Sequence, residues 1–213
     1  MTCWNCKQEL AADALFCPEC ETLQPPLPGR DYFQILELPR TFTLAPATLE
    51  QAFKRLSRQL HPDRFATASP RVRRLSLEHA TALNDANRTL RVPVKRAEYL
   101  LELWGRPIGK EDSRSQLPLE LMETVMELRE QIADAKFEGD QATLSRRLED
   151  VSRQWRDRYA SVEALFSQLK TLSDPTQEKS LMDKLEQELH MLRYLQGILT
   201  EHGMSPTPAT PDR

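Results

Sequence analysis

All four cysteines of the chain lie within its first twenty residues. Cys3 and Cys6 form one Cys-x2-Cys pair, and Cys17 and Cys20 form a second pair after ten intervening residues. Each pair places two thiolates on one tight turn, and two such turns close a tetrahedron around a zinc ion. Because protein ligands fill all four positions, we expect a structural Zn site with no position open for catalysis.

Two other chemistries compete for these cysteines. Iron in a rubredoxin-like site is the main alternative to zinc, and a redox-active dithiol comes after it. Two disulfides would suit a small secreted protein, but nothing else in the sequence resembles one. The segment is too short for a core of its own, so a metal would supply most of its folding energy. The turns lack the glycine that often follows such pairs.

The second candidate is the tripeptide His61-Pro62-Asp63. On its own it has a purely structural interpretation, in which the proline ends a helix and the aspartate caps a turn. The preceding segment has an apolar helical face opposite three basic residues, Lys54, Arg55 and Arg58. Such a basic face is either simply solvated or a docking surface for an acidic partner. The sequence offers no recognisable catalytic group, and we expect no enzymatic activity.

Apolar residues at helical spacing predict the elements that position these motifs. We expect helices over about 46–60, 70–90, 93–104, 119–137 and 141–170, and a last one that holds residues 181–199 after a turn at 173–175, with prolines at several starts and glycines after several ends. The last three are long and joined by short turns, which favours an antiparallel bundle. The predicted fold class is therefore all-α.

Composition limits the function further. The net charge of −3 argues against bulk nucleic-acid binding, and no apolar run approaches the roughly 20 residues of a membrane span. The start of the chain lacks a signal or transit pattern. We therefore expect a cytoplasmic bacterial protein, with the mature form of a mitochondrial matrix protein as the alternative.

Residues 31–105 resemble a J domain, the module that binds DnaK-type chaperones, and several further segments resemble the HscB co-chaperone family. The matching segments are Asp31-Tyr32-Phe33-Gln34-Ile35-Leu36, Leu60-His61-Pro62-Asp63-Arg64-Phe65, Ala82-Leu83-Asn84-Asp85-Ala86, Arg96-Ala97-Glu98-Tyr99-Leu100-Leu101, Met126-Glu127-Leu128-Arg129-Glu130 and Leu192-Arg193-Tyr194-Leu195. The resemblance implies a J domain packed on a C-terminal three-helix bundle. It also makes His61, Pro62, Asp63, Lys54, Arg55 and Arg58 the residues that bind a DnaK/HscA-type ATPase.

The predicted organisation follows from this resemblance and from the proline-rich breaks. Residues 1–24 form the tetracysteine segment, 25–30 a proline-rich linker and 31–105 the J domain. Residues 106–116 form a second linker, 117–202 the client-binding bundle and 203–213 a disordered tail.

The resemblance also implies that the bundle binds an IscU-type iron–sulfur scaffold. Met122 and Met126 lie off the expected core stripe of their helix, and flexible methionines on an exposed face suit partner binding. Met191, Tyr194 and Ile198 likewise lie off the main stripe of the last helix. A helix with two neighbours needs a wide apolar face, so core packing is an equal alternative for both sets. The implied scaffold-binding residues are Met122, Met126, Glu127, Glu130, Asp134 and Tyr194.

The expected function is a co-chaperone for iron–sulfur cluster transfer. A general J-protein with a different client is the alternative, although such a protein would carry a Gly/Phe-rich linker or β-rich client domains. A zinc or redox enzyme would need an open coordination position or an activated thiolate. The cysteine extension has three open roles: sensing iron, stabilising the J domain or making a homodimer contact.

Overall fold

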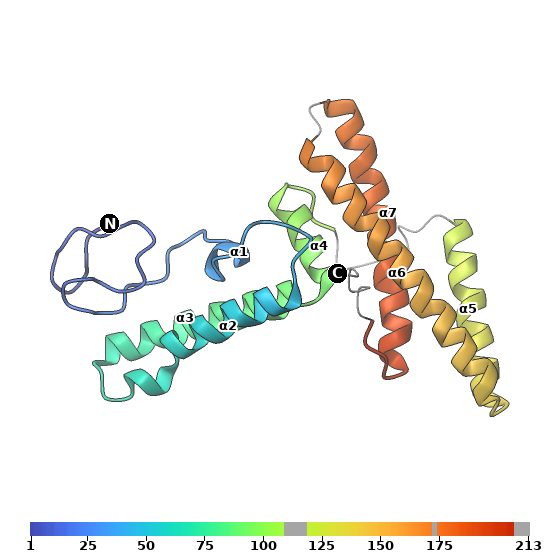
Figure 1. Ribbon diagram of the computed structural model, residues 1–213, viewed down its shortest axis with the longest axis horizontal. Coiled ribbons are helices and arrows are strands. Elements are labelled where there is room, and N and C mark those ends of the chain that lie inside the picture. The colour runs from blue at the N-terminus through green and yellow to red at the C-terminus, as the bar shows by residue number, and fades with distance from the viewer. Residues whose placement is uncertain (109–118, 172–173, 207–213) are drawn as a thin grey trace. The chain divides into compact units, whose positions relative to one another are not determined.

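The computed structural model describes residues 1–108, 119–171 and 174–206 (Figure 1). Parts of the predicted linker 106–116, of the predicted tail 203–213 and of the turn at Ser173 lie outside these ranges. The described residues form helices joined by loops and no strand, which confirms the all-α prediction. None of these helices is long and apolar enough to cross a membrane. The chain divides into two compact units, Met1–Arg96 and Ala97–Arg213.

The elements follow the predicted order closely. They are α1 (Tyr32–Ile35), α2 (Pro46–Leu60), the 3-10 helix η1 (Pro62–Phe65), α3 (Pro70–Leu90), α4 (Pro93–Leu103), α5 (Leu119–Phe137), α6 (Gln141–Thr171) and α7 (Pro175–Glu201). Proline occupies the first turn of several of them, where its missing N–H leaves no bond unmade. Gly105 and Gly139 follow α4 and α5 with positive φ values of 77° and 72°, a conformation that glycine adopts without steric cost.

In the first unit, α2 and α3 pack against each other as a helical hairpin, with η1 between them (Figure 1). The side chain of Ser69 caps α3 by accepting a hydrogen bond from the N–H of Val72 at 3.4 Å. Ala45 precedes α2 and makes no such bond, so α2 starts on its proline alone. The two helices bury their apolar faces against each other, including Leu49, Leu56, Leu60, Leu75 and Leu83.

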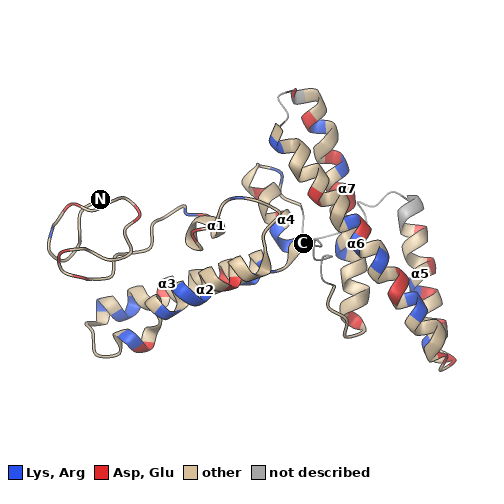
Figure 2. Ribbon diagram, viewed as in Figure 1, with Lys and Arg blue, Asp and Glu red and all other residues tan. Residues whose placement is uncertain are grey.

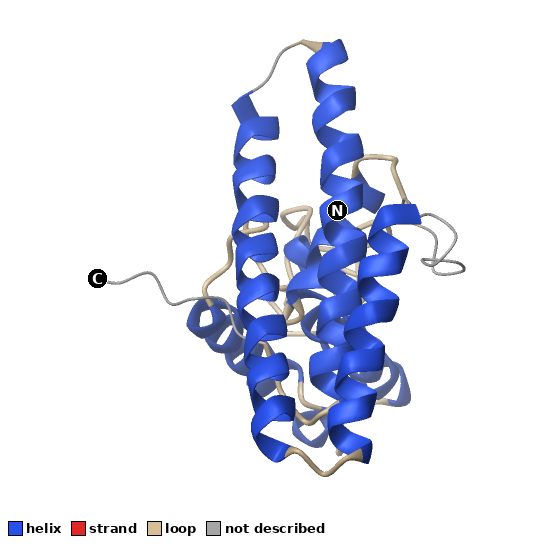
Figure 3. Cartoon of the chain, turned by 90° about the vertical axis from the view of Figure 1, so that its right-hand side faces the viewer, coloured by secondary structure: helices blue, strands red, loops and turns tan. Residues whose placement is uncertain are grey.

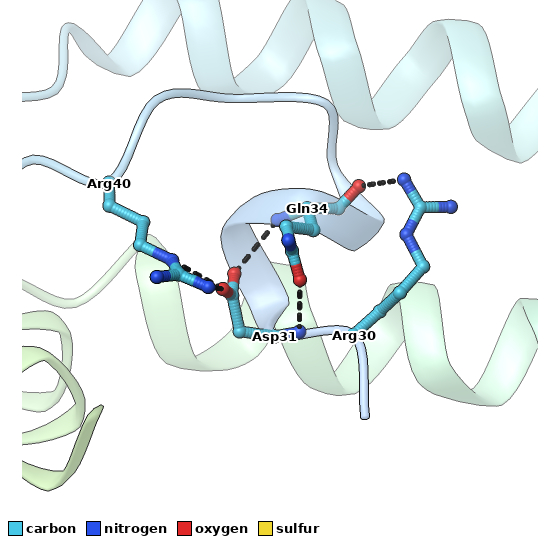
Figure 4. Close-up of polar contacts among 4 residues, drawn as sticks. All are labelled: Arg30, Asp31, Gln34 and Arg40. Carbon is cyan, nitrogen blue, oxygen red and sulfur yellow. Dashed lines mark hydrogen bonds and ion pairs between the residues drawn. The ribbon is translucent and has the colours of Figure 1, made fainter. Parts of the chain in front are cut away.

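The short helix α1 packs on α3 and is held by its own first residues (Figure 4). The Asp31 carboxylate accepts a hydrogen bond from the N–H of Gln34 at 2.9 Å, and the Gln34 side-chain oxygen accepts one from the N–H of Asp31 at 3.0 Å. Arg40 donates from Nε to the second carboxylate oxygen of Asp31 at 2.6 Å. This reciprocal cap lets a helix of a single turn hold Phe33 in the core.

The second unit contains the long helices α5, α6 and α7, which run side by side in Figure 3. Helix α6 packs on both α5 and α7, and its core face carries Val151, Trp155, Val162 and Phe166. Ion pairs reinforce the packing, from Arg158 of α6 to Glu188 of α7 at 2.8 Å and from Arg129 of α5 to Glu201 of α7 at 3.0 Å. The predicted three-helix bundle is thus present.

Of the two interpretations of Met191, Tyr194 and Ile198 on the last helix, core packing holds for two of the three residues. Met191 and Ile198 are buried in the core, together with Leu185, Leu189 and Leu192. Helix α7 packs on α6 and also contacts α5 through the Tyr194 hydroxyl, so it needs an apolar face wider than one stripe. Only Tyr194 of this set keeps part of its side chain at the surface.

Candidate metal centre and interaction surfaces

The four cysteines come together as their spacing predicted. The sulfur of Cys3 lies 3.8 Å from that of Cys20, and the sulfur of Cys6 lies 3.5 Å from that of Cys17. All four ligand atoms lie within 4.8 Å of one another. Sulfurs at the corners of a tetrahedron with zinc–sulfur bonds of ~2.3 Å lie about 3.8 Å apart. The cluster therefore has the dimensions of a four-thiolate metal site.

Each cysteine pair sits on a small hairpin closed by one β-bridge, Thr2 with Glu9 and Phe16 with Leu23. The residue after each pair has a left-handed backbone, with φ of 68° at Lys7 and 53° at Glu21. This is the position where glycine was missing from the sequence pattern. The turn needs this backbone because the N–H of Lys7 bonds the carbonyl of Cys3 at 3.1 Å and that of Glu21 bonds the carbonyl of Cys17 at 2.8 Å.

The surroundings of the sulfurs favour a bound cation. A hydrogen bond with the Thr22 side chain is the largest effect that lowers the pKa of Cys20, to about 6. The backbone N–H of Gln8 lowers the pKa of Cys6, but desolvation and the three neighbouring sulfurs outweigh it and raise that pKa to about 12. Four thiolates this close do not all ionise without a positive charge between them, and a divalent metal supplies that charge.

The second site is the loop after α2. The Nδ1 atom of His61 accepts a hydrogen bond from the backbone N–H of Asp63 at 3.3 Å, so His61 caps η1. The side chains of His61 and Asp63 are 54% and 91% exposed. On its inner side the loop is held by α3, where the hydroxyl of buried Ser76 donates a hydrogen bond to the carbonyl of Leu60 at 2.8 Å. The loop therefore has a fixed backbone and exposed polar side chains.

The predicted basic face adjoins this loop, and Figure 2 shows Lys and Arg along α2 and α3. Lys54, Arg55 and Arg58 are exposed. Lys54 pairs with Glu50 at 2.5 Å and Arg55 with Glu37 at 2.6 Å, so their charges are partly compensated within the chain.

Sequence reasoning missed two residues at this surface. A hollow of about 370 Å³ joins the helix to the loop, and its lining includes Phe53 and Arg64 besides Lys54, Ser57, Arg58 and His61. Arg64 donates to the carbonyl of Arg58 at 3.2 Å, which brings a further cation to the basic face. Its position directly after the tripeptide was the available signal. Phe53 belongs to the apolar side of α2 by its spacing, and the structure leaves it half-buried beside the hollow.

The third candidate is the outer face of α5. Val125 and Ile132 are buried, whereas Met126 is 65% exposed. Glu127, Glu130 and Asp134 are exposed beside it, and Figure 2 shows the acidic residues along α5. Met122 is half-buried. Tyr194 reaches this helix from α7, because its hydroxyl donates to the carbonyl of Val125 at 3.1 Å and Arg129 lies over its ring at 5.2 Å.

One apolar residue of this face was missed. Phe137, the last residue of α5, is 93% exposed. It follows Met126 by eleven residues and therefore lies about 20° from it on an ideal helix of 3.6 residues per turn. A helical wheel extended to the end of α5 would have found it. Together, Met126 and Phe137 form an apolar row bordered by Glu127, Glu130 and Asp134.

Comparison with known proteins places the chain among relatives. Residues 117–201 match the family model described as the HSCB C-terminal oligomerisation domain. The chain is 31% identical over 209 residues to the mouse iron–sulfur cluster co-chaperone protein HscB, covering 97% of this chain and 83% of that protein. The chain belongs to the HscB family. A bacterial HscB homologue from Burkholderia multivorans is 34% identical and covers 81% of this chain and 91% of its own.

Solved HscB structures agree with this assignment. The crystal structure of the human co-chaperone protein HscB matches with a TM-score of 0.81 and 28% identity, covering 94% of this chain and 96% of the human chain. The chaperone HscB from Vibrio cholerae matches with a TM-score of 0.65 and 31% identity, covering 81% of this chain and 94% of its own. These HscB relatives are named chaperones or co-chaperones, and this HscB-family chain is accordingly a co-chaperone.

Proposed function

We propose that this chain docks on a DnaK/HscA-type chaperone, stimulates its ATPase and delivers an IscU-type iron–sulfur scaffold to it. The observation that carries the proposal is the loop His61-Pro62-Asp63, which α2 and α3 hold at the surface of an HscB-family chain. The ATPase reaction itself belongs to the partner. This chain contributes the contacts that bring chaperone and scaffold together.

The chaperone-docking surface consists of His61, Pro62 and Asp63 with Lys54, Arg55 and Arg58, and we add Arg64 and Phe53. Its basic residues suit an acidic partner surface, since opposite charges speed encounter and fix orientation. Phe53 and the hollow beside it offer a small apolar contact at the centre of these charges. Exposed Asp63 then remains available to a basic group of the partner.

The scaffold-binding surface consists of Met122, Met126, Glu127, Glu130, Asp134 and Tyr194, and we add Phe137. Exposed apolar side chains bordered by charges are the usual composition of an interface core with a polar rim. The proposed domains that carry the two surfaces are the J domain at 31–105 and the bundle at 117–202.

For the metal centre, we propose structural zinc bound by Cys3, Cys6, Cys17 and Cys20, with iron as the rival occupant. The distances between sulfurs suit either ion, so metal analysis of the purified protein decides between them. We further propose that the protein works in the bacterial cytoplasm, with the mitochondrial matrix as the alternative.

The first test measures ATP hydrolysis by a purified DnaK/HscA-type chaperone with and without this chain. His61→Gln should abolish the stimulation, because the amide cannot reproduce the ring contacts of the loop. Arg73→Ala, at an exposed position on α3, is the matched control and should stimulate fully. Full stimulation by the His61 variant, with its helical circular dichroism unchanged, would refute the docking surface.

The second test measures binding of a purified IscU-type scaffold by calorimetry. Met126→Ala should weaken binding about 5- to 30-fold, the usual range for an interface anchor. Because Met126 is largely exposed, this change leaves the bundle intact. Tyr194→Ala is a poorer probe, since it also removes a hydrogen bond to α5. Unchanged affinity for the Met126 variant would refute the surface on α5.

A further inference from the structure

Gln24 connects the cysteine cluster to the helical hairpin. Its side chain is almost fully buried, at 1% exposure. The Nε2 atom donates to the Cys3 sulfur at 3.4 Å and to the carbonyl of Thr22 at 2.7 Å. The Oε1 atom accepts a hydrogen bond from the backbone N–H of Trp4 at 3.4 Å. The side-chain amide of Gln24 is therefore hydrogen-bonded to both cysteine hairpins.

The backbone of the same residue contacts α3. The Gln24 carbonyl lies 2.9 Å from Nε2 of His79, across 55 positions of sequence. Two turns earlier on α3, the guanidinium of Arg71 lies 4.1 Å from the ring centroid of Trp4. Trp4 is itself fixed to the second hairpin, because its indole N–H donates to the carbonyl of Leu23 at 2.9 Å. The metal segment thus contacts α3 at two points, His79 and Arg71.

Helix α3 also anchors the loop that begins at His61. Ser76, which donates to the carbonyl of Leu60, lies three residues before His79 and is completely buried. The contact to the metal segment and the contact to the loop are therefore less than one turn apart on a single rigid helix. Local unfolding of α3 around His79 would therefore weaken both the contact to the metal segment and the contact to the His61 loop.

We propose that binding of a metal ion by the four cysteines stabilises α3 and the His61 loop, with Gln24 and His79 as the positioning residues that couple them. The cysteine hairpins have almost no apolar core, so the metal holds them in shape. When they lose that shape, the Gln24 carbonyl leaves His79 and Trp4 leaves Arg71. The amino-terminal half of α3 then opens more often, and the carbonyl of Leu60 loses its anchor more often.

The test is hydrogen–deuterium exchange of the full chain, zinc-loaded and stripped with a chelator. In the unaltered protein, removing zinc should speed exchange in residues 61–65 and 70–83 about fivefold, as expected for loss of one net hydrogen bond. In His79→Ala, the metal should change exchange there less than twofold. Equal metal effects in both proteins, or no metal effect on α3, would overturn the proposal.

Two further variants keep the test decisive if His79→Ala loosens α3 altogether. His79→Gln retains an N–H that can reach the Gln24 carbonyl, so it should restore much of the metal dependence. Gln24→Ala should reduce it, whereas Gln8→Ala, at an exposed position of the same segment, should not. Loss of the metal dependence in the Gln8 variant would show a general loosening and contradict a specific role for Gln24.

Coupling between two sites is reciprocal, so the same contacts must also act on the metal. His79→Ala should weaken zinc binding about fivefold in a competition with a chromophoric chelator, although His79 is not a ligand. Unchanged zinc affinity would overturn the coupling. Neither measurement uses a chaperone, so this inference can fail while the proposed co-chaperone function stands, and the reverse also holds.

Discussion

The tetracysteine segment and the α5–α7 bundle keep their shapes by different means. The segment buries few large apolar side chains, holds two non-glycine residues in a left-handed backbone and gathers four sulfurs. The bundle buries Trp155, Leu185 and Leu189 completely and gathers no comparable set of metal ligands among its described residues. One chain thus combines a region whose fold depends on a bound ligand with a region whose fold depends on its apolar core.

Metal removal should give the largest difference between the two regions. Zinc binding supplies about 10 kcal/mol or more to small four-ligand segments near neutral pH, so Cys17→Ser or chelation should unfold residues 1–24. The bundle should keep its protection. Hydrogen–deuterium exchange measured on peptides from both regions checks this expectation. Persistent protection of 1–24 without metal would show that the segment has a sufficient core of its own.

Core truncation should have the opposite effect. Trp155→Ala removes a fully buried ring that stacks on Tyr159 at 5.4 Å, and it should lower the free energy of unfolding by about 3–5 kcal/mol. Urea denaturation followed by circular dichroism measures the loss, and zinc affinity should stay unchanged. Trp104→Ala, which removes a partly exposed ring, is the control and should cost less. Equal costs for both changes would contradict a core centred on α6.

A third change separates stability from binding within the bundle. Phe137→Ala should leave the free energy of unfolding within about 0.5 kcal/mol, because the ring is exposed. It should weaken scaffold binding by about 1–2 kcal/mol if the apolar row on α5 extends to its last residue. Calorimetry with the purified scaffold checks it, and Lys136→Ala next to it is the control. A lower free energy of unfolding with unchanged scaffold affinity would show that Phe137 stabilises the bundle and does not bind the scaffold.

A fourth pair of changes tests whether the left-handed backbone of the cysteine hairpins lowers zinc affinity. Lys7→Gly and Glu21→Gly place glycine where the backbone is left-handed, which relieves about 1 kcal/mol at each position. Zinc affinity, measured by chelator competition, should therefore rise about fivefold per site. Glu9→Gly on the same hairpin is the control and should lower affinity, since it adds chain freedom without relieving strain. Weaker binding by the first two variants would contradict this account.

Acid should have the smallest effect, and it should act on both regions. Burial lowers the pKa of His79 in the first unit and of His190 in the second. Each folded-state pKa lies below the ordinary value of 6.5, so the unfolded chain binds more protons between the two values. The free energy of unfolding is therefore highest above pH 6.5, and it falls as the pH drops from 6.5 through the lowered pKa of each folded-state histidine. Urea midpoints at pH 7.5 and 5.5 measure it, and His79→Gln should reduce the difference.

Much of the helical architecture could be predicted from local signals. Proline at positions 46, 70 and 93, the capping Ser69 and the glycines at 105 and 139 mark helix boundaries because they act on the nearest backbone bonds. The gathering of the cysteines could likewise be predicted, since the chemistry of a four-thiolate site determines their spacing.

What could not be predicted depends on contacts between distant residues. Met191 and Ile198 are buried because α7 has neighbours on two sides, which periodicity within one helix does not reveal. Likewise, the approach of Gln24 to His79 and of Ser76 to Leu60 joins segments that no local pattern connects. For Met126 on α5, 65% exposure beside buried Val125 excludes core packing, whereas Met122 is half-buried.

The hydrogen bond from Ser76 to Leu60 also lowers the entropy cost of binding at the His61 loop. Its backbone is tied to α3 on one side, and the His61 ring ties it to the N–H of Asp63 on the other. Few of its torsions remain to be frozen when another surface meets it, so little conformational entropy is lost in the encounter. This preorganisation favours binding at the loop without adding any contact, because less entropy opposes the association.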